Sequence, residues 1–436
     1  MKPDGAGELG THVAPRAYLT AGIPPLGGVI KQRPEDFLVD ELPAYQPCGE
    51  GEHIYMLVQK RGLSSLEMIG VIARHFGVAR NAVGYAGLKD KHAITRQVVS
   101  VHVPGKRTED FPAFEHEQIE VLWVDRHTNK LRPGHLRGNR FSIKVRNVAP
   151  TAVLVARKVL ASLKQTGVPN RFGEQRFGLL ENNHLVGRAI VKGDWEGAAA
   201  ELLGPSPRFP GVNQEARALF AAGKYREAAP HFPPGAKSEL VVLKGLADGK
   251  DARRAFLRLD ETVLRYYLSA FQSAVFNAVL DGRVLDGELG GLHVGDLAFK
   301  HANGAVFDVT EGVMADTDTD RRLSAFEISP SGPMWGAQMP RGGGRTDHAE
   351  VTALANLGLT PEDLVAFGAR APGKLEGKRR PLRVPLIDPE VEGGLDEHGP
   401  YVRCAFELPR GSFATVVLRE IMKPAQEVGQ DAPDED

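Results

Sequence analysis

The sequence has little cysteine and no long apolar run. Its 436 residues include only two cysteines, Cys48 and Cys404, which form neither a disulfide framework nor a CxxC metal-ligand pair. No stretch approaches the ~18 apolar residues of a membrane-spanning helix, and the first residues lack the apolar core of a signal peptide. These absences predict a cytoplasmic protein that does not associate with membranes.

Nucleotide and metal motifs are also missing. The sequence contains no GxxxxGK[ST], GxGxxG or HExxH pattern. One string, Asp316 to Asp320 with Glu327 in the twelfth place, has the spacing of an EF-hand loop, but Arg321 stands where that loop needs glycine. A solvated acidic loop is the favoured interpretation, and we expect no metal and no cofactor.

The pattern of apolar residues predicts one α+β domain that is interrupted by an insertion. Alternating or apolar segments predict strands at 54–60, 97–103, 120–124, 140–148, 306–309 and 401–408. Residues 181–260 are instead rich in Ala, Gly and Pro with short helical patterns, and a long helix is expected from about 260 to 280. Because a strand pattern like that of the first part of the chain returns near residue 401, the middle of the chain is interpreted as an insertion.

Several helix ends carry capping signals. Ser64 and Glu67 form the pattern of a capping box, and Gly77 marks the end of the same helix. Thr151 and Ser412 stand where N-caps are expected, and a further helix is predicted after Thr360. At the chain ends, composition predicts a flexible leader and an acidic tail.

Residues 126–146 carry seven Lys or Arg and two His with no acidic residue. Such a run is either a solvated basic hairpin or a surface that neutralises RNA phosphates. Phe141 within it suits stacking on an unpaired base, although periodicity equally places it in the core. Two further basic clusters, 373–383 and 250–258, favour a folded RNA as partner over a small metabolite, although the net charge is -1.

The segment 85–97, YAGLKDKHAITRQ, places Asp90 between Lys89 and Lys91, shortly after Gly87. Such a run is most often an exposed ion pair of little energetic consequence. The alternative is a carboxylate that the lysines keep charged and that acts as a nucleophile or base. Residue chemistry alone leaves both interpretations open.

AGLKDKHAITRQ resembles the signature of the TruD family of tRNA pseudouridine synthases. Further segments are similar to family segments in the same order, and the resemblance covers most of residues 30–422. These segments are PEDFLVDE (34–41), GEGEH (49–53), KLRPGHLRGNRF (130–141), VPNRFGEQRFG (168–178), LSAFQSAVFNAVL (268–280), SGPMWG (331–336) and LPRGSFATVVLRE (408–420).

The resemblance implies a fold and a domain plan. The expected core is a mixed, largely antiparallel sheet flanked by helices, interrupted by an inserted α/β TRUD domain. The expected boundaries are a flexible leader at 1–25, a catalytic domain at 26–169 and 386–423, the insertion at 170–385, and an acidic tail at 424–436. The implied reaction converts uridine 13 of tRNA to pseudouridine without a cofactor. The expected partner is tRNA, with no obligate protein partner.

By the same resemblance Asp90 is the catalytic carboxylate and Lys31 its ion-pair partner, although a lysine at that place is otherwise an ordinary surface residue. Phe37 and Phe413 match family residues that wall the base pocket, and without the resemblance either is a core residue. Asn139 is expected to hydrogen-bond the uracil edge, since an amide both donates and accepts, although an Asn after Gly138 is otherwise typical of a turn.

Three supporting pocket residues are also expected, namely Glu41, His53 and Gln97. Arg132, Arg137 and Arg140, from the acid-free run, are expected to contact the RNA backbone. Whether the carboxylate attacks C1′, adds to the pyrimidine or removes the C2′ proton stays open.

Two rival functions make different demands on the sequence. A non-catalytic RNA-binding or chaperone protein on the same scaffold needs the basic patches but not Lys31, Asp90, Asn139 and Phe413 together. A metal-dependent RNA hydrolase requires paired carboxylates near the site, and the Asp316 string falls in the insertion.

Overall fold

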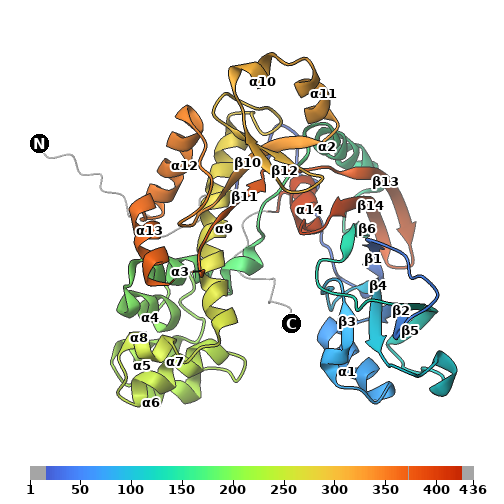
Figure 1. Ribbon diagram of the computed structural model, residues 1–436, viewed down its shortest axis with the longest axis horizontal. Helices are drawn as coiled ribbons and strands as arrows, with labels where there is room; N and C mark the ends of the chain where they lie inside the picture. Colours follow the sequence, from blue (N-terminus) through green and yellow to red (C-terminus); the bar gives the residue numbers. More distant parts are fainter. Residues whose placement is uncertain (1–15, 372, 425–436) are drawn as a thin grey trace, which may run out of the picture. The chain divides into compact units, whose positions relative to one another are not determined.

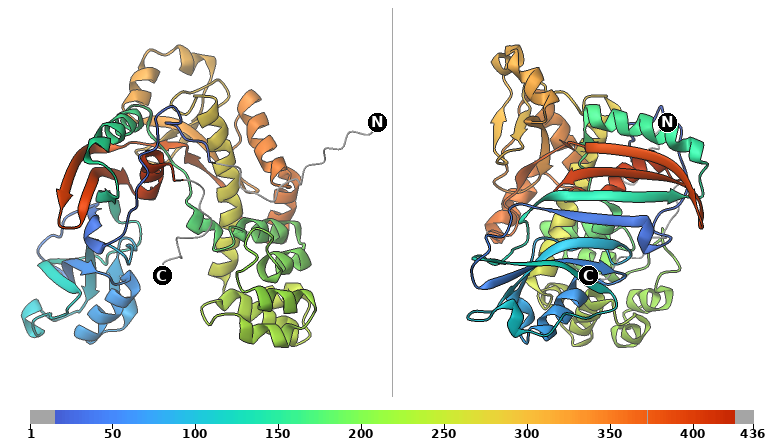
Figure 2. Two further views of the ribbon diagram at one scale, coloured as in Figure 1. Left: turned by 180° about the vertical axis from the view of Figure 1, so that it is seen from behind. Right: turned by 90° about the vertical axis from the view of Figure 1, so that its right-hand side faces the viewer.

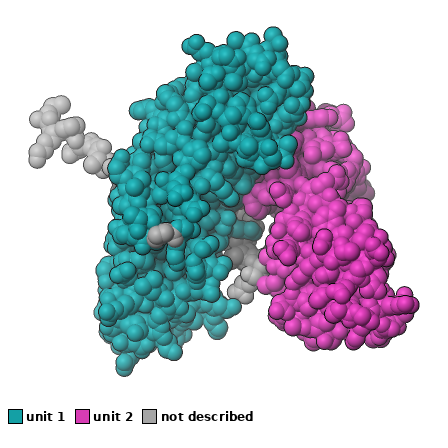
Figure 3. Space-filling view, in the orientation of Figure 1, with its two compact units in different colours: residues 1–19, 169–383 teal, residues 20–168, 384–436 magenta. Residues whose placement is uncertain are grey.

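The structure, a computed structural model, describes residues 16–371 and 373–424. These residues form two compact units, shown in different colours in Figure 3. The sheet unit comprises 20–168 and 384–424, and the inserted unit comprises 16–19 and 169–383. The first fifteen residues of the predicted leader and the predicted acidic tail beyond residue 424 lie outside the described residues.

The sheet unit is built on one eight-stranded sheet with three α-helices. Its strands are β1 (Phe37–Pro43), β2 (His53–Arg61), β3 (Val83–Tyr85), β4 (Ile94–His102), β5 (Ile119–His127), β6 (Leu136–Arg146), β13 (Ile387–Asp396) and β14 (Gly399–Pro409). Its helices are α1 (Ser65–His75), α2 (Val153–Thr166) and α14 (Ala414–Met422).

The strand order is β13-β14-β6-β1-β4-β2-β5, and β3 pairs with β4 beside this path. The strands lie side by side in the right-hand view of Figure 2. β1 runs parallel to β4, whereas the other neighbouring pairs of this sheet are antiparallel. The predicted mixed, largely antiparallel sheet flanked by helices is therefore confirmed.

Helix α1 covers one face of the sheet at β2, β3 and β4. Its apolar side chains Met68, Ile69 and Ile72 share a buried cluster with Met56 of β2 and Val99 of β4. The capping box of Ser64 and Glu67 is present, and Gly77 follows the helix end with a positive φ of 64°. The local sequence thus fixes both ends of α1, and its first turn lies beside the end of β2.

The inserted unit is mainly helical with a four-stranded sheet, β11-β10-β8-β9. Its strands are β8 (Leu297–Lys300), β9 (Val306–Asp308), β10 (Ile328–Met334) and β11 (Lys378–Pro381). Its helices are α3 (Asn183–Lys192), α4 (Trp195–Leu203), α5 (Gln214–Ala221), α6 (Tyr225–Ala228), α7 (Lys237–Ala247), α8 (Ala252–Phe256), α9 (Glu261–Leu285), α10 (Glu311–Ala315), α11 (Asp318–Ser324), α12 (Gly344–Asn356) and α13 (Pro361–Arg370).

The long helix α9 organises this unit, and Figure 1 shows it running through the yellow part of the ribbon. Tyr267, Phe271 and Val275 of α9 pack in the same buried cluster as Val186 of α3 and Leu203 of α4. The predicted helix from 260 to 280 is confirmed and continues to Leu285, with Asp260 as its N-cap. Two short segments, β7 (Val168–Pro169) and β12 (Arg383–Val384), pair where the chain enters and leaves the insertion.

Two predicted N-caps are wrong. Thr151 lies inside a 3-10 turn, Pro150–Ala152, that precedes α2, and Ala152 occupies the cap position. Ser412 is the last residue of a turn closed by its N–H to the Pro409 carbonyl, so α14 begins only after Phe413. In both places an unpredicted turn moves the helix start beyond the hydroxyl.

In the described part of the chain, no helix combines the length and the hydrophobicity that a membrane crossing requires.

Burial makes the inserted unit sensitive to acid. Burial, together with Arg188, lowers the pKa of His184 to about 4, and burial with Arg383 does the same for His301. Between pH 6.5 and 4 the unfolded chain therefore binds more protons, and the free energy of unfolding falls as the pH falls. We expect a loss of about 2 kcal/mol per histidine between pH 7 and pH 5, measured by denaturant unfolding.

His184→Leu should remove its share of this loss. His348→Leu, at an exposed position of α12, is the matched control and should leave the pH dependence unchanged. Equal pH dependence in wild type and His184→Leu would contradict the assignment.

Candidate active site

Asp90 and Lys31 are brought together by the parallel pairing of β1 with β4. Lys31 lies on the segment that enters β1, and Asp90 lies on the loop that enters β4. Because parallel strands begin at the same edge of a sheet, the two segments meet there. The Lys31 Nζ lies 3.8 Å from the Asp90 Oδ2, with side chains 23% and 38% exposed. The predicted pair is thus present and open to solvent.

The two lysines beside Asp90 in sequence do not form its ion pair. The Lys89 ammonium is buried and lies 2.5 Å from the Glu41 carboxylate of β1. The Lys91 ammonium lies 3.9 Å from Glu67, at the first turn of α1. Neither lysine beside Asp90 in sequence is therefore its ion-pair partner, because each points to a different element.

Two buried groups hold the loop that carries Asp90. The Lys60 Nζ donates to the Asp90 carbonyl at 2.7 Å and to the Lys89 carbonyl at 3.3 Å. The Ser65 hydroxyl accepts from the Lys89 N–H at 2.8 Å. A Cβ at Gly87 would lie 3.1 Å from the Lys89 ammonium, so a larger residue there would press on the Lys89 side chain. The backbone of 87–90 is therefore held from the sheet and from α1.

Arg146 of β6 holds the segment that carries Lys31. Its guanidinium donates two hydrogen bonds to the buried Asp36 carboxylate, at 2.6 and 2.9 Å, and two more to Asp396. Its backbone exchanges two hydrogen bonds with Val29. Lys31, between these two anchored points, has a left-handed backbone with φ of 57°. The side-chain ion pairs raise the pKa of Arg146, so the anchor stays charged.

Three of the predicted pocket residues form one row across the sheet. Glu41 of β1 is opposite Asn139 of β6, and the parallel register of β1 and β4 places Gln97 on its other side. The Asn139 Oδ1 and the Gln97 Oε1 are buried and accept no hydrogen bond in the described structure. A buried acceptor without a donor is costly, so these two amides are candidates to bind a ligand.

Asn139 also depends on the glycine before it. A Cβ at Gly138 would come within 2.1 Å of the Leu408 carbonyl oxygen on β14. Only glycine permits this close approach of β6 and β14, which sets the place of the Asn139 side chain.

The three predicted aromatic residues differ in exposure. Phe37 is buried, with the Lys31 ammonium 5.0 Å from its ring centre. Phe141 is 7% exposed and packs against Phe406 with 5.7 Å between ring centres. Phe413, at the start of α14, is 46% exposed. Of the three, Phe413 offers the most ring surface for stacking.

His53 lies away from the other predicted residues. It begins β2, whereas the Asp90 loop lies at the far end of that strand, and eight residues of strand span about 26 Å. It also lies seven positions from Lys60, which places the two side chains on opposite faces. His53 stacks on His102 instead, and burial, with this neighbour, lowers its pKa.

The basic run 126–146 divides into paired and exposed cations. Arg140 donates to Glu407 and Glu390, and Lys144 and Arg146 share Asp396. Arg132 and Arg137 are exposed, and Arg137 donates to the Pro43 carbonyl. Arg126 and Lys130 are half-buried and donate to the carbonyls of Gly51 and Asn81, so the most exposed charges of the run lie at 132 and 137.

The basic cluster 373–383 does not form an RNA-binding surface as a whole. Arg379 forms a buried ion pair with Glu350, each side chain being 1% exposed. Arg383 is also buried and donates to the Leu323 carbonyl. These two arginines are buried inside the inserted unit, where they bond to other parts of that unit. The charge pattern of the sequence does not distinguish them from exposed arginines.

The acidic string at 316–327 folds partly as α11, and Arg321 donates to both Asp318 and Glu327. An internal cation thus stands among its carboxylates. Among residues 16–371 and 373–424, no group of three or more His, Cys, Asp or Glu side chains is placed to hold a metal ion.

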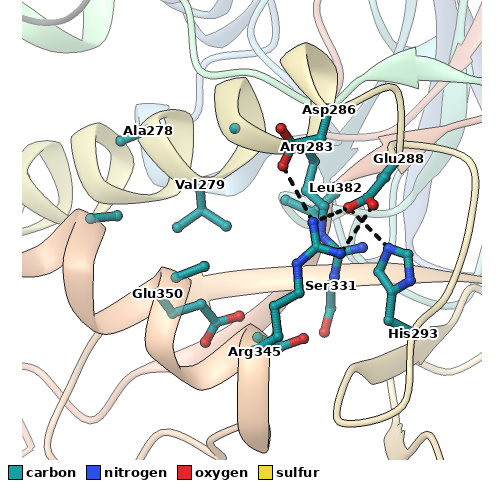
Figure 4. Close-up of a pocket in the computed structure, with 14 residues that line it drawn as sticks. Ala278, Val279, Arg283, Asp286, Glu288, His293, Ser331, Arg345, Glu350 and Leu382 are labelled. Atoms are coloured by element: carbon teal, nitrogen blue, oxygen red, sulfur yellow. Dashed lines mark hydrogen bonds and ion pairs between the residues drawn. The ribbon is translucent and has the colours of Figure 1, made fainter.

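A small cavity of about 120 Å³ lies in the inserted unit between α9, α12 and β10 (Figure 4). Its charged side chains form ion pairs, either with one another or, for Arg283 and Glu350, with Asp296 and Arg379. Arg345 contacts Asp286 and Glu288, and Glu288 also contacts His293. The pairing leaves little charge for a ligand.

Sequence reasoning missed Lys60 and Arg146. A signal for Lys60 was available, because strand alternation puts it on the same face as Ile54, Met56 and Val58, all buried. A lysine that continues a buried row is unusual and indicates a special role. Arg146 gave no such signal, since it ends a run of cations.

The comparisons with known proteins first define the class. The fold matches a crystal structure described as tRNA pseudouridine synthase D from Methanosarcina mazei, with a TM-score of 0.81 and 27% identity. The match covers 94% of this chain and 97% of the other. The architecture is thus that of a pseudouridine synthase structure.

The particular family follows from the sequence. The family model for tRNA pseudouridine synthase D (TruD) matches residues 14–421, and the chain belongs to this family. It is 43% identical over 410 residues to a tRNA pseudouridine synthase D of Geobacter metallireducens, covering 94% of this chain and 98% of the relative. It is 37% identical over 420 residues to one of Anaeromyxobacter dehalogenans, covering 96% and 99%.

The exposure of the aromatic residues gives a test of their roles in stability. We expect Phe141→Ala to lower the free energy of unfolding by about 3–5 kcal/mol, because it empties a buried site against Phe406. Phe413→Ala is the control at an exposed position, and its loss should be below about 1 kcal/mol. Equal losses in chemical denaturation would contradict this division.

Proposed function

We propose that the protein converts uridine 13 of tRNA to pseudouridine, with Asp90 as the catalytic carboxylate and without a cofactor. Membership of the TruD family supports a tRNA pseudouridine synthase, an isomerase. The observation that carries the assignment of Asp90 is its ion pair with Lys31, open to solvent at the sheet edge where β1 and β4 begin.

The reaction is an isomerisation. The N1–C1′ bond of uridine breaks, the uracil turns, and C5 bonds to C1′; the proton at C5 leaves and N1 gains one. Electrons and groups balance within the nucleoside, so the reaction needs no redox partner or donor. A group is needed only to assist bond cleavage at the sugar and to move protons, which a carboxylate can do.

Lys31 suits the role of partner to Asp90. An ammonium close to a carboxylate favours its charged form and orients it. At 3.8 Å the two charges attract without a short hydrogen bond, so the carboxylate oxygens remain available to a substrate. Each of the three routes, namely attack at C1′, addition to the base and removal of the C2′ proton, requires such a charged and accessible carboxylate.

Asn139 and Phe413 are proposed to hold the base. Uridine within folded tRNA must leave its stack to react, which costs a few kcal/mol. The exposed ring of Phe413 can stack on the extruded base, a contact worth about 1–3 kcal/mol. The unpartnered Asn139 Oδ1 can accept the uracil N3–H, a donor that cytosine lacks.

Glu41 and Gln97 are proposed to support this pocket from the same row of the sheet, and Phe37 to pack beneath Lys31. Phe141, two residues after Asn139 on the same face of β6, then acts through packing against Phe406 and not by stacking on the base. The distant place of His53 gives it no part in base binding in this proposal.

The central test of the proposal is Asp90→Asn. The change keeps the shape and removes the charge, so pseudouridine formation should fall below detection in single-turnover assays with saturating enzyme. Binding of tRNA and the melting temperature should stay near wild type. Asp40→Asn, at an exposed carboxylate paired with Arg96, is the matched control and should remain active.

Lys31→Met should lower the same rate by a smaller factor, because it leaves the Asp90 carboxylate in place. Wild-type turnover by Asp90→Asn would refute the mechanism. Wild-type protein that binds tRNA but forms no pseudouridine would instead support the alternative of a non-catalytic RNA-binding protein.

The exposed arginines predict the salt dependence of tRNA binding. In Arg132→Gln/Arg137→Gln the slope of log K against log salt should flatten by about one unit per lost phosphate contact. Arg140→Gln should change the slope less, because Glu390 and Glu407 already balance its charge. Filter binding between 50 and 200 mM salt measures both; an unchanged slope in the double variant would exclude these contacts.

A further inference from the structure

We propose that Lys60 is a positioning residue whose buried ammonium sets the backbone of the Asp90 loop. The inference rests on the proposed function, because it concerns the loop that presents the proposed catalytic carboxylate. The proposed role is indirect, since the Lys60 side chain acts through main-chain carbonyls.

The geometry of Lys60 is that of a built-in anchor. The residue belongs to β2, next to its last residue, and is 0% exposed. Its Nζ lies 2.6 Å from the Leu63 carbonyl oxygen, 2.7 Å from that of Asp90 and 3.3 Å from that of Lys89. One ammonium thus joins the turn before α1 to the two consecutive peptides around Asp90.

Burial of an ammonium is costly unless dipoles replace its water. Here three carbonyl dipoles point at it, which offsets that cost and fixes the orientation of the two loop peptides. Without the cation these carbonyls would face one another in a dry site, where like dipoles repel and lack donors. The loop would then turn its carbonyls outward.

The orientation of the peptide after Asp90 affects the direction of its side chain. A peptide that rotates about the Cα moves the Cβ of Asp90 and hence the carboxylate, which now lies 3.8 Å from Lys31. A displacement of a reacting group by about 1 Å can reduce a rate by about 100-fold. Lys60 therefore acts on the rate of reaction and not on the binding of tRNA.

Other anchors of the same loop are neutral or lie farther from Asp90. The Ser65 hydroxyl bonds the N–H and carbonyl of Lys89, and the Lys89 side chain holds Glu41. The Asp90 carbonyl itself accepts from Lys60, at 2.7 Å. The charged anchor thus sits closest to the carboxylate that it positions.

The experiment compares Lys60→Met with Lys91→Met and Asp90→Asn. Methionine matches the length of lysine but leaves the three carbonyls without their donor, so we expect some loss of stability, measured as the melting temperature. We expect Lys60→Met to reduce kcat and the single-turnover rate by about 100-fold, with KM for tRNA and the dissociation constant within about twofold of wild type. Lys91→Met removes an exposed lysine of the same loop and should react as wild type.

A second variant guards against loss of folding. Lys60→Gln keeps one amide donor at the site, and its rate should lie between those of wild type and Lys60→Met at the same melting temperature. Wild-type kcat in Lys60→Met, or a loss of activity that only follows the unfolded fraction, would overturn the positioning role. Activity in Asp90→Asn would instead overturn the proposed function, so the two failures are distinguishable.

Discussion

The parallel pairing of β1 with β4 is the constraint on which the site depends. Lys31 and Asp90 lie on segments that enter these two strands, so parallel alignment brings both segments to one edge of the sheet. Antiparallel alignment would separate them by the length of a strand. The remaining strand pairs of this sheet are antiparallel, so the site lies at its parallel pair, β1 and β4.

Strand pairing alone does not hold a pair of side chains that come from loops. Two buried cations complete the arrangement, Arg146 for the segment of Lys31 and Lys60 for the loop of Asp90. Arg146 binds the carboxylates of Asp36 and Asp396, and Lys144 also pairs with Asp396, so the charges of this network balance. Lys60 binds carbonyls of the backbone, which fixes main-chain direction. With both segments fixed, the partly exposed side chains of Lys31 and Asp90 are held 3.8 Å apart.

The cations of the basic run at 126–146 differ in the same way, since some are paired within the fold and others are exposed. Cations toward the end of β6 meet carboxylates of β13 and β14 and become part of the sheet. Of the cations before Asn139, Arg132 and Arg137 are exposed, whereas Arg126 and Lys130 are half-buried and donate to backbone carbonyls. A run that reads as uniformly basic thus serves folding at one end and offers positive charge to solvent at the other.

Local signals in the sequence determined much of the fold. Apolar or alternating segments predicted the strands at 54–60, 97–103, 120–124 and 401–408, and the capping box at Ser64 predicted the start of α1. Both signals depend only on near neighbours in the sequence. The resemblance to the TruD family supplied Lys31 as the partner of Asp90, which residue chemistry alone could not select.

Tertiary structure alone decided which charges meet. Lys89 pairs with Glu41, 48 residues earlier, and Arg146 pairs with Asp36, 110 residues earlier. Tertiary structure also buries Phe141 and exposes Phe413. His53 lies at the end of β2 that is remote from the Asp90 loop. The physical reason is that charge and ring contacts carry no sequence period. They follow from strand order and register, which join residues far apart in the chain.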